Sequence, residues 1–283
     1  MVCYESENEI IYIELLASGS LTLICSISII IFCFCFDILE GFSRKILLYL
    51  SFNNTFRALI IIISANRQLK DVCFILAYIS SICLLSNVVW ALSIPVTLYM
   101  VLIKGVQNIE KYHIRWVLCC YGVVPCILAI PFFTNSYGEK GLVCALKENY
   151  VSYIWSITLI YTPSWGLIIV IIALYMKLYR HVKRTKEIKY KSIITDRGMI
   201  YSLIIGFSML PMTIIRFIYL FYQSCTLNTL YSFSLGLIHL QGFFNLIALS
   251  LNSKIQIVIK QKLKSSKSDT FDLFSNNSFT LTT

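Results

Sequence analysis

The sequence predicts an all-α protein, a seven-transmembrane helix bundle with its N-terminus outside and its C-terminus in the cytoplasm. The 283 residues are 58% hydrophobic and only 13% charged, with a mean hydropathy of +0.76. One soluble core could not bury so much apolar surface. The apolar residues form seven runs that can cross a hydrocarbon core about 30 Å thick as helices. The alternating, roughly ten-residue segments of a membrane β-barrel are absent.

The elements follow in order along the chain. Residues 1–9 form a short acidic extracellular leader, which differs from a secretory signal because its flank is acidic and the apolar run behind it is too long. Residues 10–252 form the transmembrane domain, and residues 253–283 form a cytoplasmic tail. We expect the seven spans at residues 10–36, 46–65, 72–103, 114–133, 150–176, 198–222 and 230–251.

The third span is the longest uninterrupted apolar run, because no charge occurs between Asp71 and Lys104. A run of this length predicts a tilted helix at the centre of the bundle.

The distribution of Lys and Arg sets the orientation. With the N-terminus outside, the outer loops hold only Arg67, Lys70, Lys140 and Lys147. The remaining basic residues outside the spans then lie inside, in the loops and the tail. The positive-inside rule therefore predicts this orientation. It also explains the net charge of +10 without nucleic-acid binding.

Four of the eleven cysteines lie at or near the outer, oxidising face: Cys3, Cys73, Cys144 and Cys225. Cys73 opens the third span and Cys144 lies in the loop after the fourth, so a disulfide between them would hold that loop over the mouth of the bundle. A second disulfide between Cys3 and Cys225 and a pair of free thiols are equally compatible with the sequence. No Cys or His spacing indicates a metal site.

Several motifs resemble a known family. They include Tyr161-Thr162-Pro163-Ser164-Trp165 in the fifth span and, most specifically, Leu240-Gln241-Gly242-Phe243-Phe244-Asn245 in the seventh. Together with Trp90 and Thr97-Leu98-Tyr99, these residues resemble the cyclic-AMP receptor and receptor-like family of G-protein-coupled receptors from social amoebae. The similarity runs from about Phe42 to Asn252.

The chain departs from the family pattern at Val143 and Ala145, which replace tryptophans beside the loop cysteine, at Leu249, which replaces a tyrosine, and at Pro95. The resemblance implies a plasma-membrane receptor for a small extracellular ligand that activates a heterotrimeric G protein. It leaves the identity of the ligand open.

Two arginines lie inside predicted spans, where an ionisable side chain is costly and indicates a functional site. Arg57 is near the middle of the second span and Arg216 is in the outer third of the sixth. We expect Arg216, Arg57 and Lys147 to bind the ligand, which would then be anionic. Asn53, Asn54 or Asn245 could satisfy Arg57, and Arg216 could instead extend to the outer interface.

Gln241, Gly242 and Asn245 form a helix-packing motif on the seventh span. The two amides share one helix face and can hydrogen-bond to neighbouring helices, and the glycine allows another backbone to approach. The same residues could hold helices together without any signalling role. Prolines 131, 163 and 211 can kink the fourth, fifth and sixth spans.

The densest basic segment joins the fifth and sixth spans. It could serve only topology and contact with anionic lipid, or it could dock a G protein through Arg180, Lys183, Arg184 and Lys186.

Enzymatic classes fit poorly, because clustered histidines, paired aspartates inside spans and a glycine-rich phosphate loop are absent. No cofactor is expected. A polytopic channel or transporter is the alternative class.

Overall fold

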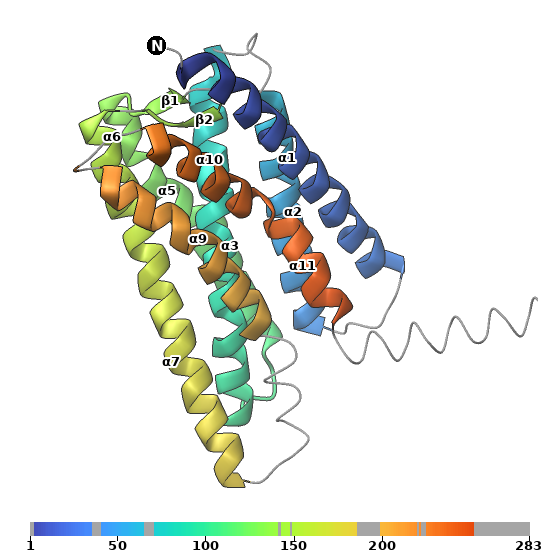
Figure 1. Ribbon diagram of the computed structural model, residues 1–283. Helices are drawn as coiled ribbons and strands as arrows, with labels where there is room; N and C mark the ends of the chain where they lie inside the picture. The colour runs from blue at the N-terminus through green and yellow to red at the C-terminus, as the bar shows by residue number, and fades with distance from the viewer. Residues whose placement is uncertain are drawn as a thin grey trace, which may run out of the picture.

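Long helices run side by side, and a two-stranded β-hairpin lies across one end of the bundle (Figure 1). We call this the hairpin end, and the opposite end, where the last turn of α7 lies, the far end. The computed structural model describes residues 3–35, 41–64, 71–140, 143–147, 149–185, 199–219, 221 and 225–251. The side chains at 3–10, 41–43, 140, 185, 199, 201–202, 219, 225–229 and 232 are outside this description, as are the predicted tail 253–283 and Lys186.

The first three spans are α1 (Cys3–Cys35), α2 (Gly41–Ser64) and α3 (Cys73–Leu102). α1 begins inside the predicted leader, because residues 3–9 contain no helix breaker and acidic residues favour a helix N-terminus. α3 is the central helix, as its sequence predicts, since it contacts α2, α7, α9 and both strands. Its fully buried Trp90 stacks on Tyr49 of α2 at 4.4 Å between ring centroids.

The fourth and fifth spans are helical along nearly their whole length, but their hydrogen bonding changes between α-, π- and 3₁₀-helical. The fourth consists of η2 (Glu110–Tyr112), α4 (His113–Leu118), η3 (Cys119–Val123), α5 (Val124–Leu128) and η4 (Ile130–Thr134). The fifth consists of α6 (Tyr150–Trp155), η5 (Ser156–Tyr161) and α7 (Thr162–Thr185).

The irregular turns of these two spans lie beside prolines. The π-helical segments η3 and η5 end just before Pro125 and Pro163, and the 3₁₀ segment η4 contains Pro131. Proline has no N–H to donate and its ring crowds the carbonyl four residues earlier, so the preceding turn cannot keep regular α-helical bonding.

The helix α7 extends well beyond residue 176, where the fifth span was predicted to end. Its buried stripe continues through Tyr175, Leu178 and Val182, which pack against the end of α3. These residues keep the helical spacing of an apolar face, while Arg180 and Lys183 point to the exposed side.

The sixth span is α9 (Met199–Tyr219), which contains Pro211. The seventh, predicted as one helix, is broken at Leu240 into α10 (Cys225–His239) and α11 (Gln241–Ser250). The axes of Phe233–His239 and Gln241–Ser250 differ by 49°.

The break leaves backbone carbonyls without helical partners, and side chains from other helices satisfy two of them. The carbonyl of Ile238 accepts a hydrogen bond from Arg57 Nη1 at 3.2 Å, and the carbonyl of His239 accepts one from Thr22 Oγ1. Because water is scarce in a membrane, such partners allow an interrupted helix to persist there.

Five helices among the described residues are long and apolar enough to cross a membrane, or six if the bent pair α10–α11 counts as one span. α9 contributes a shorter apolar helix, Leu203–Ile218. Large apolar side chains such as Phe34 and Ile169 face outward, while Asn53, Asn87 and Gln241 are buried. Apolar outside and polar inside is the pattern of a multi-pass membrane protein.

Candidate functional site

The hairpin consists of β1 (Tyr137–Lys140) and β2 (Val143–Leu146), paired antiparallel with Glu139 opposite Cys144. A disulfide joins Cys144 to Cys73 at the start of α3, with 5.1 Å between their Cα atoms. Tyr137 also fastens the hairpin, because its buried hydroxyl donates to the carbonyl of Leu128 at 2.8 Å. The loop is therefore held over the hairpin end, as the cysteine positions predict. The side chains of Cys3 and Cys225 are outside the described part of the chain.

A cavity of about 100 Å³ lies directly beneath β2. α2, α3, η5, α9 and α10 form its walls, and residues 143–146 contribute to its lining. Arg57 and Arg216 both line it, although they are far apart in the sequence. No Asp or Glu of the described chain is among the lining residues.

Arg57 is 5% exposed and is held by the broken seventh span. Its Nη1 donates to the carbonyl of Ile238 and to Gln241 Oε1 at 3.3 Å, and its Nη2 lies 3.3 Å from His239 Nδ1. These partners differ from the asparagines expected from the sequence. Asn53 and Asn54 instead hydrogen-bond to Asn87 of α3.

Arg216 is 6% exposed, so its guanidinium stays inside the bundle rather than reaching the interface. Its Nη2 donates to the hydroxyl of Tyr231 at 3.0 Å. The guanidinium also lies over the rings of Tyr231 and Tyr153, at 4.9 and 5.6 Å from the ring centroids. Such cation–π contacts stabilise a buried cation but do not neutralise its charge.

Lys147 is not part of the cavity. Its Nζ donates to Asn135 Oδ1 at 3.0 Å, and its stem lies over Gly138 of the hairpin. Of the three residues predicted to bind a ligand, the structure brings Arg57 and Arg216 together and leaves Lys147 on the loop.

A buried polar network continues from the cavity toward the middle of the bundle. Gln241 connects three helices, since it accepts from Arg57, lies 3.5 Å from Asn87 Nδ2 and donates to Ser208 at 3.2 Å. Gly242 packs against Thr22 of α1, and Asn245 is buried on the same face of α11. The predicted packing motif therefore lies where α1, α2, α3, α9 and α11 meet.

Sequence reasoning missed the residues that surround the two arginines. Tyr153, Tyr231 and His239 belong to none of the motifs found in the sequence, and Tyr161 was noted only as part of the Tyr161–Trp165 motif, with no role at the site. His239 offered one signal, since it lies within a predicted span two residues before Gln241.

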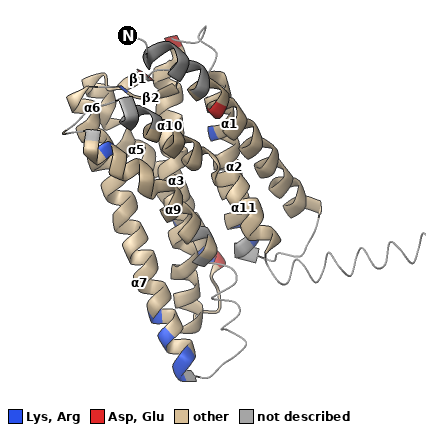
Figure 2. Ribbon diagram, viewed as in Figure 1, with Lys and Arg blue, Asp and Glu red and all other residues tan. Residues whose placement is uncertain are grey.

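Basic side chains gather at the far end. Figure 2 shows Lys and Arg along the last turns of α7, and Arg180, Lys183 and Arg184 are exposed there. Lys186, predicted as part of the same group, is outside the described residues.

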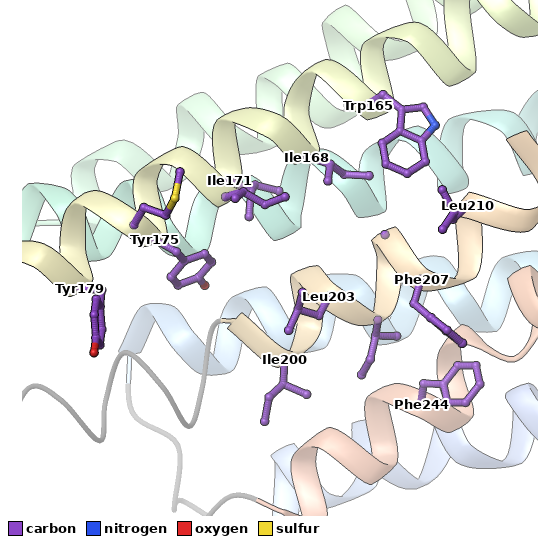
Figure 3. A pocket seen from close by; sticks show the side chains of 14 residues that line it. Trp165, Ile168, Ile171, Tyr175, Tyr179, Ile200, Leu203, Phe207, Leu210 and Phe244 are labelled. Carbon is purple, nitrogen blue, oxygen red and sulfur yellow. The ribbon is translucent and has the colours of Figure 1, made fainter. Parts of the chain in front are cut away.

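A second, larger cavity of about 1030 Å³ lies between α7 and α9 (Figure 3). Its walls are almost entirely apolar, from Trp165 at one end to Tyr179 at the other, with Phe207 and Phe244 facing each other at one side. It lacks the convergent polar groups that orient a ligand, so the smaller cavity is the better candidate site.

The whole architecture matches a known membrane-receptor fold. The structure of squid rhodopsin superposes with a TM-score of 0.70 at 12% sequence identity, covering 94% of this chain and 86% of that one. The chain therefore has the fold of rhodopsin, a receptor of seven transmembrane helices. No family model matches the sequence.

Two proteins of known class are similar in sequence. G-protein coupled receptor 1 of Arabidopsis thaliana is 22% identical over 249 residues, which cover 83% of this chain and 76% of the relative. Cyclic AMP receptor-like protein A of Dictyostelium discoideum is 24% identical over 258 residues, which cover 88% of this chain and 65% of the relative.

The chain is therefore distantly homologous to these two proteins and shares the rhodopsin-like fold of G-protein-coupled receptors, which are non-enzymatic receptors. The resemblance to the cyclic-AMP receptor-like family is thereby confirmed.

Proposed function

We propose that this protein is a plasma-membrane G-protein-coupled receptor that binds a small extracellular ligand at the hairpin end and activates a heterotrimeric G protein at the far end. The observation that carries the proposal is the cavity beneath β2, where Arg57 and Arg216 converge from distant parts of the chain. Buried cations that line a cavity in a membrane bundle are typical of a ligand site.

The charge distribution supports this orientation. The exposed basic residues of α7 lie at the far end, which the positive-inside rule assigns to the cytoplasm. The hairpin end is then extracellular, where the disulfide between Cys73 and Cys144 can persist.

The polar network offers a route between the two ends. A ligand that contacts Arg57 acts on Gln241, and Gln241 is bonded to Ser208 in the middle of α9. If the ligand binds one arrangement of α9 better than another, it shifts the population of the two arrangements. The far end of α9 then moves relative to α7, where the G protein docks.

The docking step is tested by neutralising Lys183, Arg184 and Lys186 together to Gln. We expect membrane insertion and ligand binding to be retained and G-protein activation to fall at least tenfold. The matched control neutralises Lys104 in the loop after α3, Lys111 in η2 and Arg115 in α4, all of them exposed, and should keep signalling.

Nucleotide exchange on a purified G protein, measured in membranes that contain each variant, provides the readout. Full activation by the α7 variant, or equal loss in both variants, would contradict docking at α7. A ligand-gated current in the absence of any G protein would instead support the channel alternative.

A further inference from the structure

We propose that the ligand of the arginine cavity is a compact dianion, with two negative charges on a few heavy atoms, as in a short dicarboxylate or hydrogen phosphate. This inference rests on the proposed receptor function and specifies the chemistry of its site.

The charge of the cavity lining is unbalanced. Arg57 and Arg216 are each more than nine-tenths buried, and the described lining of the cavity contains no carboxylate. An isolated buried cation is costly, and two in one cavity repel each other as well. A ligand with two negative charges compensates both guanidiniums, whereas a monoanion leaves one positive charge uncompensated.

The cavity contains buried nitrogens that lack a hydrogen-bond acceptor. Among the described residues, the Nε atoms of Arg57 and Arg216 and the Nε2 atom of His239 are buried without a hydrogen-bond partner. All three residues line the cavity. Buried donors nearly always have an acceptor, so three orphan nitrogens in one place indicate a missing group rich in acceptors.

The protonation of His239 follows from its neighbour. Arg57 Nη2 can only donate, so His239 Nδ1, at 3.3 Å, is the acceptor of that bond. A neutral imidazole then carries its hydrogen on Nε2, which makes this nitrogen the third donor available to the ligand. A dicarboxylate dianion offers only acceptor oxygens, and hydrogen phosphate has three unprotonated oxygens beside its one P–OH group, so both match three donors.

The volume of the cavity limits the ligand to a few heavy atoms. A cavity of about 150 Å³ holds a benzene molecule of six heavy atoms, so about 100 Å³ accommodates roughly four to six. Hydrogen phosphate and oxalate are of this size and malonate is slightly larger. A nucleotide is several times larger and would require the disulfide-held hairpin to move away.

The cavity wall supports a polar head group rather than an apolar ligand. The hydroxyl groups of Ser64, Ser80 and Ser156 line it. Tyr161 also lines the cavity and lies within electrostatic range of both Arg57 and Arg216. These groups can solvate an anion at positions that the guanidiniums do not reach.

The test uses the purified full chain in nanodiscs of uncharged phosphatidylcholine. Thermal unfolding is followed at constant ionic strength while malonate, hydrogen phosphate, acetate or a cyclic nucleotide is titrated. A ligand that binds only the folded state raises the unfolding temperature as its concentration passes Kd. We expect saturable stabilisation by malonate or hydrogen phosphate and none by acetate, and the stronger of the two identifies the head group.

Variants distinguish site binding from general salt effects. Arg57→Gln and Arg216→Gln should each weaken dianion binding about 10- to 100-fold, the value of a charge-assisted hydrogen bond. Arg115→Gln, which removes the same charge at an exposed position, should leave binding unchanged. Stabilisation that persists in both cavity variants would be an unspecific effect of the anion and would overturn the proposal.

A purely structural role for Arg216 predicts a different result. If Arg216 only stacks on Tyr153 and Tyr231, Arg216→Gln lowers the unfolding temperature without ligand and leaves the response to malonate intact. That outcome would overturn the proposal. Should Arg57→Gln fail to fold, Arg57→Lys retains the charge with fewer donors, and weakened dianion binding in a folded protein supports the assignment.

The same measurements distinguish a wrong ligand class from a wrong receptor function. Stabilisation by the cyclic nucleotide with no response to either dianion overturns the compact-dianion assignment and leaves the receptor proposal standing. Dianion binding without G-protein activation by the same sample supports the assignment and contradicts the proposed coupling.

Discussion

Gly242 illustrates how single residues set the packing of this bundle. A Cβ atom at this position would lie 2.7 Å from Thr22 Cγ2 and 2.9 Å from the Thr22 carbonyl oxygen. The side chain could rotate away, but the backbone oxygen of α1 could not, so only glycine allows α11 to approach so closely. This contact lies one residue from Gln241, and hence beside the polar network.

We therefore expect Gly242→Ala to lower the free energy of unfolding by about 1–3 kcal/mol, the usual cost of overpacking. Thermal unfolding of the purified protein measures it. Gly166→Ala is the control, because a Cβ atom there meets nothing within 4 Å and alanine favours a helix. Equal unfolding temperatures for both variants would show that α1 and α11 are not closely packed.

The arginines show how far residue-level prediction reaches. A charge inside an apolar run is visible in the sequence, so Arg57 and Arg216 could be predicted as site residues. Their partners could not, because Ile238 is 181 positions from Arg57 and is joined to it through a backbone carbonyl that any residue could supply. Tyr231 pairs with Arg216 through a hydroxyl that no motif singles out.

Among the elements, the hairpin and the broken seventh span were predicted with very different success. The hairpin position followed from two cysteines at one face. The sequence around Leu240 did not predict the break, because the residue is neither glycine nor proline. The carbonyls that the break leaves free belong to the two preceding residues and accept hydrogen bonds from α1 and α2. Hydrophobic periodicity describes only neighbours along the chain, so it cannot predict a helix break that side chains of other helices stabilise.

The disulfide gives a prediction for the hairpin. Replacing both Cys73 and Cys144 with Ser releases a loop of 71 residues, which costs about 4 kcal/mol in the chain-entropy model. We expect a lower unfolding temperature and an additional loss of ligand binding, because β2 forms part of the cavity wall.

Cys126→Ser, at an exposed free cysteine, should change neither property. Mass mapping of the unreduced wild-type protein supplies the direct measurement. Free thiols at both Cys73 and Cys144 would contradict the hairpin anchor.

For the whole molecule, composition alone predicted the class of fold. Seven apolar runs and their basic flanks indicate a multi-pass bundle, and the rhodopsin-like structure agrees. What composition could not reveal is how the helices are ordered in space, because lipid-facing and buried apolar residues have the same hydropathy. The cavity depends on that order, since six elements contribute to it.

Orientation is tested on intact cells. An epitope tag at the N-terminus should be labelled without permeabilisation, and a tag inserted between residues 186 and 197 only after permeabilisation, because the positive-inside rule places the basic loop in the cytoplasm. Labelling in the reverse order would put the arginine cavity on the cytoplasmic side and exclude an extracellular ligand.

The length of the fifth span has a mechanical consequence. The helical run Tyr150–Arg184 has 35 residues and so measures about 52 Å, well above the roughly 30 Å of the hydrocarbon core. If the π-helical turn η5, which lies in the cavity wall, bends, the helix from Thr162 onward, about 36 Å long, turns about it as one body. A tilt of about 5° at η5 displaces the tip by about 3 Å and Leu178, about 24 Å along the helix, by about 2 Å, which is enough to open the contact of Leu178 with α3.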